Sequence, residues 1–152
     1  MSGKAVVSLT TGLEAKEAVR TPGERFARAL AVKDAGALCA LLAEPLDFQA
    51  LTPGRHWQAG TGKQAVEEII LARWFGTGDD ILELCSVTPG RVLDREHVAY
   101  RVRVRREGRD YLVEQQAYYN AEGPRITWMR VLCSGYQPFP GVRSASGPVA
   151  GS

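Results

Sequence analysis

The stretch from His97 to Pro138 most constrains the fold, because its pattern predicts three consecutive antiparallel strands. In its first run, apolar residues alternate with mostly charged ones, and this period of two is typical of a strand with one buried face. Gly108 and Gly123 lie in the two connections, where glycine tolerates the positive φ of tight turns. We therefore expect strands over Val98–Arg106, Tyr111–Asn120 and Arg125–Gln137.

The register of these strands follows from where each turn is centred. With Glu107–Gly108 at the centre of the first turn, Tyr100 faces Gln115. With Glu122–Gly123 at the centre of the second, Gln115 faces Arg130. The resulting polar row crosses an otherwise apolar face, and buried polar groups need partners. The row therefore indicates either a ligand cavity or an internal hydrogen-bond network, and a one-residue slip at the second turn would invert the last strand.

The opposite face of the predicted sheet is also partly apolar. It pairs Arg101 with Glu114 in this register, and it carries four apolar or thiol side chains, Leu112, Met129, Val131 and Cys133. A sheet that is apolar on both faces must be covered on both. We expect helices on one face and a second copy of the chain on the other, which makes a homodimer.

Composition bounds the class of protein. The 152 residues suit one domain, and 45% hydrophobic with 24% charged residues is ordinary for a globular protein. A net charge of +2 is too balanced to indicate a nucleic-acid or membrane partner. Cys39, Cys85 and Cys133 are widely spaced, so neither a metal site nor a disulfide framework is indicated. We expect reduced thiols in a cytoplasmic protein without a cofactor.

The remaining elements precede the three strands. Thr21 is placed to cap a first helix that begins at Pro22, and Asp34 to cap a second. After the first helix, the expected elements are a helix over Ala35–Ala43, strands over Leu46–Thr52 and Arg55–Ala59, a helix over Lys63–Trp74, a strand over Ile81–Val87 and a turn over Thr88–Gly90. Residues 1–20 are expected to be a partly ordered extension, 21–138 the domain, and 139–152 a flexible tail. Helices followed by strands predict the α+β class.

This order resembles the nuclear-transport-factor-2-like (NTF2-like) superfamily, in particular its SnoaL-like members. Three stretches carry the resemblance: RFARALAVKDAGALCALLAE, LDFQALTPGRHWQAGTG and ITWMRVLCSGYQP. The resemblance implies a cone-shaped, curved antiparallel sheet wrapped around about three N-terminal helices. It further implies a pocket at the open end of the cone and often a dimer through the outer sheet face. Such proteins include steroid isomerases, polyketide cyclases, epoxide hydrolases, dehydratases and non-catalytic binding proteins.

Two residues are candidates for acid–base catalysis. His56 has an intrinsic pKa suited to proton transfer, and the alternative is an exposed hairpin histidine. Asp47 could act as a base beside an apolar pocket, and the alternative is a solvated carboxylate at the start of a strand. The central strands Val98–Arg106 and Tyr111–Asn120 contain no Asp, which departs from the steroid isomerases. The sequence also has no Arg and Asp pair separated by one residue, as epoxide hydrolases would have.

Five further residues are candidates for ligand binding. The polar members could hold an oxyanion or carboxylate, and the tryptophans could stack on a ring, although tryptophans are more often part of the core. These candidates are Trp57, Tyr100, Gln115, Trp128 and Arg130. The first hypothesis is a pocket for a small apolar or aromatic organic molecule, with cofactor-free isomerisation, cyclisation or dehydration if it is an enzyme. The second is a non-catalytic ligand-binding or dimeric interaction module.

Overall fold

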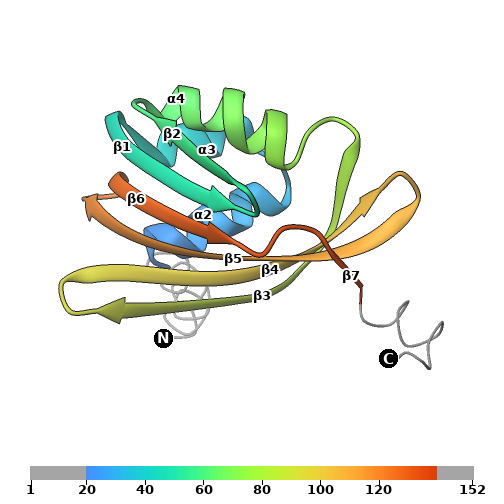
Figure 1. Cartoon of the computed structure of the whole chain (residues 1–152). Coiled ribbons are helices and arrows are strands. Elements are labelled where there is room, and N and C mark those ends of the chain that lie inside the picture. Colours follow the sequence, from blue (N-terminus) through green and yellow to red (C-terminus); the bar gives the residue numbers. More distant parts are fainter. Residues whose placement is uncertain (1–19, 140–152) are drawn as a thin grey trace, which may run out of the picture.

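A computed structural model of the protein describes residues 20–139. The elements in chain order are α2 Pro22–Ala31, α3 Ala35–Leu41, β1 Leu42–Thr52, β2 Arg55–Ala59, α4 Gly62–Gln64, the π-helix η1 Ala65–Trp74, β3 Asp79–Val92, β4 Arg95–Arg106, β5 Arg109–Glu122, β6 Arg125–Cys133 and β7 Gln137–Pro138. The helices lie together on one side of a curved sheet (Figure 1), so the α+β prediction is confirmed. The predictions for the extension and the tail fall almost entirely outside the described residues.

One sheet holds all the strands, in the order β2-β1-β6-β5-β4-β3, with β7 paired to β5 beyond the end of β6. Neighbouring strands are antiparallel except for β1 and β6, which run parallel. The sheet is therefore antiparallel as predicted apart from this one pairing. Because the helices pack on its concave side, each strand has one face toward the helices and one face away from them.

Local signals place the helix starts correctly. Thr21 Oγ1 accepts the Glu24 backbone N–H at 3.1 Å, and the Glu24 carboxylate accepts the Thr21 N–H at 2.9 Å, which completes a capping box. Thr61 caps the third helical segment through the backbone N–H of Gln64, at 3.0 Å. That segment was predicted as one helix, but it is a short α-helical turn followed by ten residues of π-helix. Helical periodicity alone does not separate the two kinds of helix.

Two predicted proline boundaries are wrong. The second helix was expected to reach Ala43, but it ends at Leu41, and β1 runs from Leu42 through Pro45. The expected turn at Thr88–Gly90 lies inside β3, which continues to Val92. β3 is an edge strand, so one proline without an N–H can sit there without breaking a ladder on its free side.

The register of the first hairpin is as predicted, but that of the second is not. Tyr100 faces Gln115 across β4 and β5. Gln115 faces Cys133 rather than Arg130. The second turn is centred one residue later than expected. This moves the pairing by two residues, so each side chain of β6 near the turn keeps its predicted face. A bulge at Thr127 then adds one residue to β6, and this odd shift inverts every side chain beyond it.

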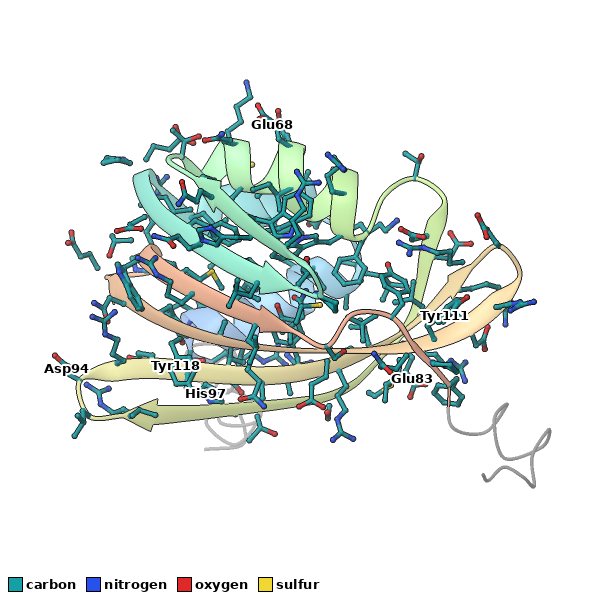
Figure 2. All side chains as sticks on the ribbon, in the orientation of Figure 1. Glu68, Glu83, Asp94, His97, Tyr111 and Tyr118 are labelled. Atoms are coloured by element: carbon teal, nitrogen blue, oxygen red, sulfur yellow. The ribbon has the colours of Figure 1, made fainter. Side chains whose placement is uncertain are left out.

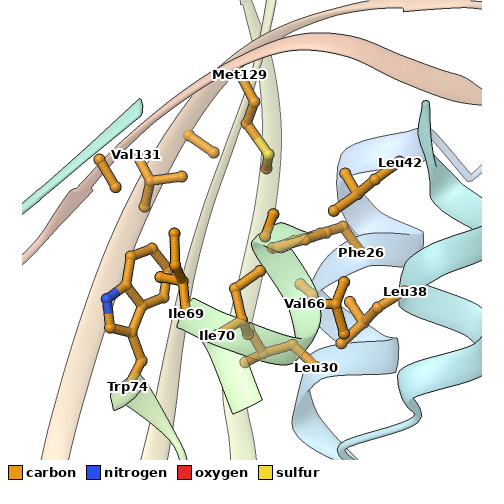
Figure 3. Close-up of a cluster of buried hydrophobic side chains, with 14 of the residues drawn as sticks. Phe26, Leu30, Leu38, Leu42, Val66, Ile69, Ile70, Trp74, Met129 and Val131 are labelled. Atoms are coloured by element: carbon orange, nitrogen blue, oxygen red, sulfur yellow. The ribbon is translucent and has the colours of Figure 1, made fainter. Parts of the chain in front are cut away.

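The inversion determines what the core contains. Met129 and Val131 were predicted on the outer face, but they point at the helices and are buried. Figure 3 shows both side chains on the same side of the sheet as Trp74, Ile69 and the α2 and α3 leucines. Trp128 and Arg130 consequently lie on the face turned away from the helices. Within residues 20–139, no helix has the length and apolar character that crossing a membrane requires.

Candidate functional site

A cavity of about 410 Å³ opens between the end of η1, the β1–β2 turn and the segment that joins β6 to β7. Four aromatic side chains contribute to its lining, namely Trp57, Trp74, Phe75 and Tyr136. Its polar lining includes Arg73, Arg106, Gln115 and Cys133. The rings are held against one another: Trp57 meets Trp74 edge-on at 6.4 Å, and Phe75 lies 6.2 Å from Tyr136. The cavity therefore combines aromatic walls with polar side chains, as small-molecule sites usually do.

Two of the cavity's polar groups are hydrogen-bond donors without a partner. Gln115 is 1% exposed, and its Nε2 has no hydrogen-bond partner among the described residues. Trp74 is 5% exposed, and its indole Nε1 has none either. Most buried polar groups in proteins are hydrogen-bonded, so two such donors around one cavity need an explanation. Both donors belong to residues that line the cavity.

Tyr100 sets the orientation of the Gln115 amide. The Tyr100 hydroxyl donates to Gln115 Oε1 at 2.6 Å. Because Tyr100 is fully buried, desolvation raises the pKa of its hydroxyl well above the ordinary value, and the group stays a neutral donor. With Oε1 occupied in this way, the amide presents Nε2 as its free end. Tyr100 is thus a positioning residue for Gln115, and it does not itself line the cavity.

An ion pair supports the wall beside Tyr136. Arg106 donates to Asp79 through Nε at 2.6 Å and through Nη2 at 2.9 Å, and its guanidinium lies 3.7 Å from the Tyr136 ring centre. The hydrogen bond from Arg106 holds the pKa of the Asp79 carboxyl below its ordinary value. The Tyr136 hydroxyl donates to the Trp74 carbonyl at 2.7 Å, and burial raises its pKa. These contacts fix Tyr136 and the end of η1 in one arrangement.

The two predicted catalytic residues lie on the outer face of the sheet. His56 Nε2 lies 2.9 Å from Gln49 Oε1, and Asp47 forms an ion pair with Arg130 at 3.0 Å. Neither His56 nor Asp47 lines the cavity. His56 and Arg130 instead border a separate hollow of about 340 Å³, which Leu51 and Leu132 also line.

The predicted ligand-binding residues divide between the two faces. Trp57 and Gln115 line the cavity, and Tyr100 reaches it only through Gln115. Trp128 packs between two guanidiniums on the other face, 3.5 Å from that of Arg95 and 4.3 Å from that of Arg130. The predicted row of Tyr100, Gln115 and Arg130 is therefore wrong, because Arg130 belongs to the part of β6 that the bulge inverts.

No protein-family model and no curated protein matches this sequence. Solved structures do match. An NTF2-like protein from Burkholderia thailandensis superposes with a TM-score of 0.59 at 13% identity, over 76% of this chain and 92% of that one. The chain has the NTF2-like fold. A protein with a ketosteroid-isomerase-like fold from Catenulispora acidiphila, solved with trimethylamine, gives 0.56 at 18% identity over 84% and 95% of the two chains.

Other NTF2-like neighbours carry different activities in their names. An LEH-like epoxide hydrolase from M. tuberculosis superposes with a TM-score of 0.54 at 14% identity, over 74% of this chain and 80% of that one. Identities this low establish the fold alone, and one fold hosts many functions. The function of a chain with this fold depends on its own cavity.

No sequence pattern marks three of the residues that matter in the cavity, namely Trp74, Asp79 and Tyr136. Trp74 is a core residue, and its indole N–H has no hydrogen-bond partner among the described residues. Tyr136 falls within the predicted last strand, and Asp79 lies outside every predicted helix and strand. Among residues 20–139, no group of three or more His, Cys, Asp or Glu side chains is placed to hold a metal ion. The cavity's chemistry therefore rests on hydrogen bonding, aromatic contact and its arginines.

Proposed function

We propose that this protein binds a small organic molecule, carrying a hydrogen-bond acceptor, in the cavity lined by Trp57, Trp74 and Gln115. The observation that carries the proposal is the pair of buried donors without partners, Gln115 Nε2 and Trp74 Nε1. Each buried donor left unpaired costs about 1–3 kcal/mol of folding stability. A bound carbonyl, ether or carboxylate oxygen that meets these donors would remove that penalty, so the cavity favours a ligand with an acceptor.

The size and walls of the cavity support an apolar or aromatic ligand. A volume of about 410 Å³ falls within the roughly 300–1,000 Å³ that is usual for small-molecule sites. Ring contacts such as that of Trp57 with Trp74 leave aromatic faces and edges against which a ring can pack. The ligand that fits this description has a ring body and at least one oxygen acceptor.

Binding is better supported than acid–base catalysis in this cavity. Among the described residues, no Asp, Glu or His lines it. The groups in its lining that could transfer a proton are Cys133 and Tyr136, and burial raises the pKa of Tyr136, which makes it a weaker acid. Isomerisation, cyclisation or dehydration through His56 or Asp47 would require a substrate on the outer face, where both side chains lie.

The test compares two glutamines that are adjacent in sequence but lie on opposite faces of β5. The neutral probe is 6-acetyl-2-naphthamide, and its dissociation constant is measured by isothermal titration calorimetry. We expect Gln115→Met to weaken binding roughly three- to tenfold, which is the value of one hydrogen bond. Gln116→Met is the matched control, because Gln116 contacts His97 and Glu114 instead of the cavity. No binding to the wild type, or equal losses in both variants, would refute the proposal.

A second copy of the chain is proposed as the partner on the outer face. Leu51 and Leu132 are neighbours there, 52% and 60% exposed, and with Tyr118 they line the outer hollow. In Figure 2 Tyr118 and His97 lie beside β3 and β4 at the lower side of the view, whereas Glu68 lies at the top, on the helix side. The face also carries the ion pairs Arg101–Glu114 and Arg105–Asp110, so it presents both signs of charge to a second copy.

Solution mass tests this second proposal. Light scattering after size-exclusion chromatography should give twice the chain mass for the wild type. Leu132→Glu should give the monomer mass, because it places a charge at the centre of the apolar patch, and the protein should stay folded because Leu132 is an exposed side chain. A wild-type monomer at micromolar concentration would contradict the proposal, as would a dimer that Leu132→Glu leaves intact.

A further inference from the structure

We infer that the ligand of the cavity is an organic anion, an aromatic or alicyclic carboxylate with a second oxygen acceptor at its far end. This inference rests on the proposed function, and it adds the ligand's charge and polarity. The inner donors, Gln115 Nε2 and Trp74 Nε1, require only an acceptor atom and do not select for charge. The selection for charge comes from the side chains around Trp57.

Two guanidiniums lie against the indole ring of Trp57. That of Arg55 is 3.7 Å from the ring centre, and that of Arg73 is 5.4 Å from it. Arg73 also belongs to the cavity lining. Within residues 20–139, neither arginine forms an ion pair with an acidic side chain. Two like charges on one ring repel each other, and an anion between them would convert that repulsion into attraction.

A third guanidinium lines the cavity, but its charge is already matched. Arg106 is paired with Asp79, and the carboxylate of Asp79 also accepts the Gly76 backbone N–H at 3.0 Å. Lys33 adds another cation close by, with its ammonium bonded to the backbone carbonyls of Gly76 and Asp79. Among residues 20–139, the cations around the cavity are Arg55, Arg73, Arg106 and Lys33, and the carboxylates that act on Arg106 are those of Asp79 and Glu107, so the net local charge is positive.

This distribution gives the ligand a direction. A carboxylate binds guanidinium groups through charge-assisted hydrogen bonds, so it belongs at the Arg55 and Arg73 side of the cavity. The acceptor at the other end of the molecule then meets Gln115 and Trp74, and the ring between them packs against the aromatic lining. A cleft with low-dielectric walls also concentrates the positive field, which raises the local concentration of anions.

The experiment compares 6-acetyl-2-naphthoate with 6-acetyl-2-naphthamide, which has nearly the same shape but no charge. Calorimetry of the wild type in about 20 mM salt should give a dissociation constant roughly three- to tenfold lower for the carboxylate, as expected for contacts with partly exposed charges. Raising the salt to about 500 mM should shrink this preference, because the opening of the cavity is exposed to solvent and salt screens the charges there.

Variants assign the preference to the proposed residues. Arg73→Glu should abolish or reverse the preference. Arg125→Glu makes the same charge change at the exposed β5–β6 turn, away from the cavity, and should leave the preference intact. Equal affinities of the wild type for the two probes would overturn the anion inference while the proposed function stands. An unchanged preference in Arg73→Glu would overturn it as well. If neither probe binds, both proposals fail.

Discussion

The Tyr100–Gln115 pair should stabilise ligand binding at the expense of folding. In the free protein, the pair makes one buried hydrogen bond at 2.6 Å and leaves Gln115 Nε2 without a partner. The hydrogen bond contributes about 0.5–1.5 kcal/mol, and the unpaired donor costs about 1–3 kcal/mol. Replacing both residues by apolar ones of similar shape removes both terms. The double variant Tyr100→Phe/Gln115→Met should therefore be as stable as the wild type or more stable, by up to about 2 kcal/mol.

The single variants should behave differently from the double. Tyr100→Phe leaves the whole Gln115 amide unpaired in the core, so it should lower the free energy of unfolding by about 1–3 kcal/mol. Gln115→Met leaves the Tyr100 hydroxyl unpaired but removes the free amide, so its net effect should lie within about 1 kcal/mol of zero. The two effects are coupled, because the residues touch.

Urea denaturation at neutral pH, followed by circular dichroism, measures all four proteins. Calorimetry with 6-acetyl-2-naphthamide then measures what the double variant loses in binding. The reasoning predicts retained or increased stability together with binding weakened at least as much as in Gln115→Met. A double variant that loses more than about 2 kcal/mol would show that the pair is structural. One that keeps wild-type affinity would show that Gln115 does not contact the ligand.

Two further predictions concern the framework of the cavity. Asp79→Asn should cost about 2–3 kcal/mol at neutral pH, below the range for fully buried pairs because the Arg106 side chain is 36% exposed. The folded-state pKa of Asp79 is lowered, so its contribution is present above the unfolded pKa near 3.9 and is lost as pH falls through the folded value. The free energies of unfolding of the variant and the wild type should thus converge at acid pH, and a difference that does not change with pH would contradict this. Gly62→Ala should lower the thermal midpoint, since its Cβ would lie 2.7 Å from a backbone carbonyl oxygen, whereas Gly60→Ala, with no described atom within 4 Å, should not.

Much of the fold could be predicted because its signals are local. The capping box at Thr21, the alternation along β4 and the turn at Gly108 each need only a few neighbouring residues. The second hairpin could not be placed, because its register depends on the bulge at Thr127, which no sequence signal marks. The parallel pairing of β1 with β6 also joins segments far apart in the chain. Such non-local contacts are decided by packing.

The candidate site was predictable only where the register was right. Tyr100 and Gln115 do meet, because the first turn fixes them. His56 and Asp47 were chosen for their chemistry, and chemistry does not say which face of a strand a side chain occupies. The sequence does not mark Arg73 as a site residue, because an arginine near the end of a helix is common. Its place beside Trp57 comes from how η1 packs over β2.

The bulge at Thr127 also explains why the cavity holds neutral donors. Without it, Arg130 would share the concave face with Gln115, and its guanidinium would be a buried charge that needs a permanent carboxylate partner. With it, Cys133 faces Gln115, and Arg130 pairs with Asp47 on the outer face. The amide of Gln115 is then left with an Nε2 that has no hydrogen-bond partner among the described residues. The guanidiniums of Arg55 and Arg73, which form no ion pair within residues 20–139, lie on the Trp57 side, where solvent can hydrate them until an anion replaces the water. A ligand can therefore enter and leave without leaving a buried charge unpaired, and reversible binding requires this.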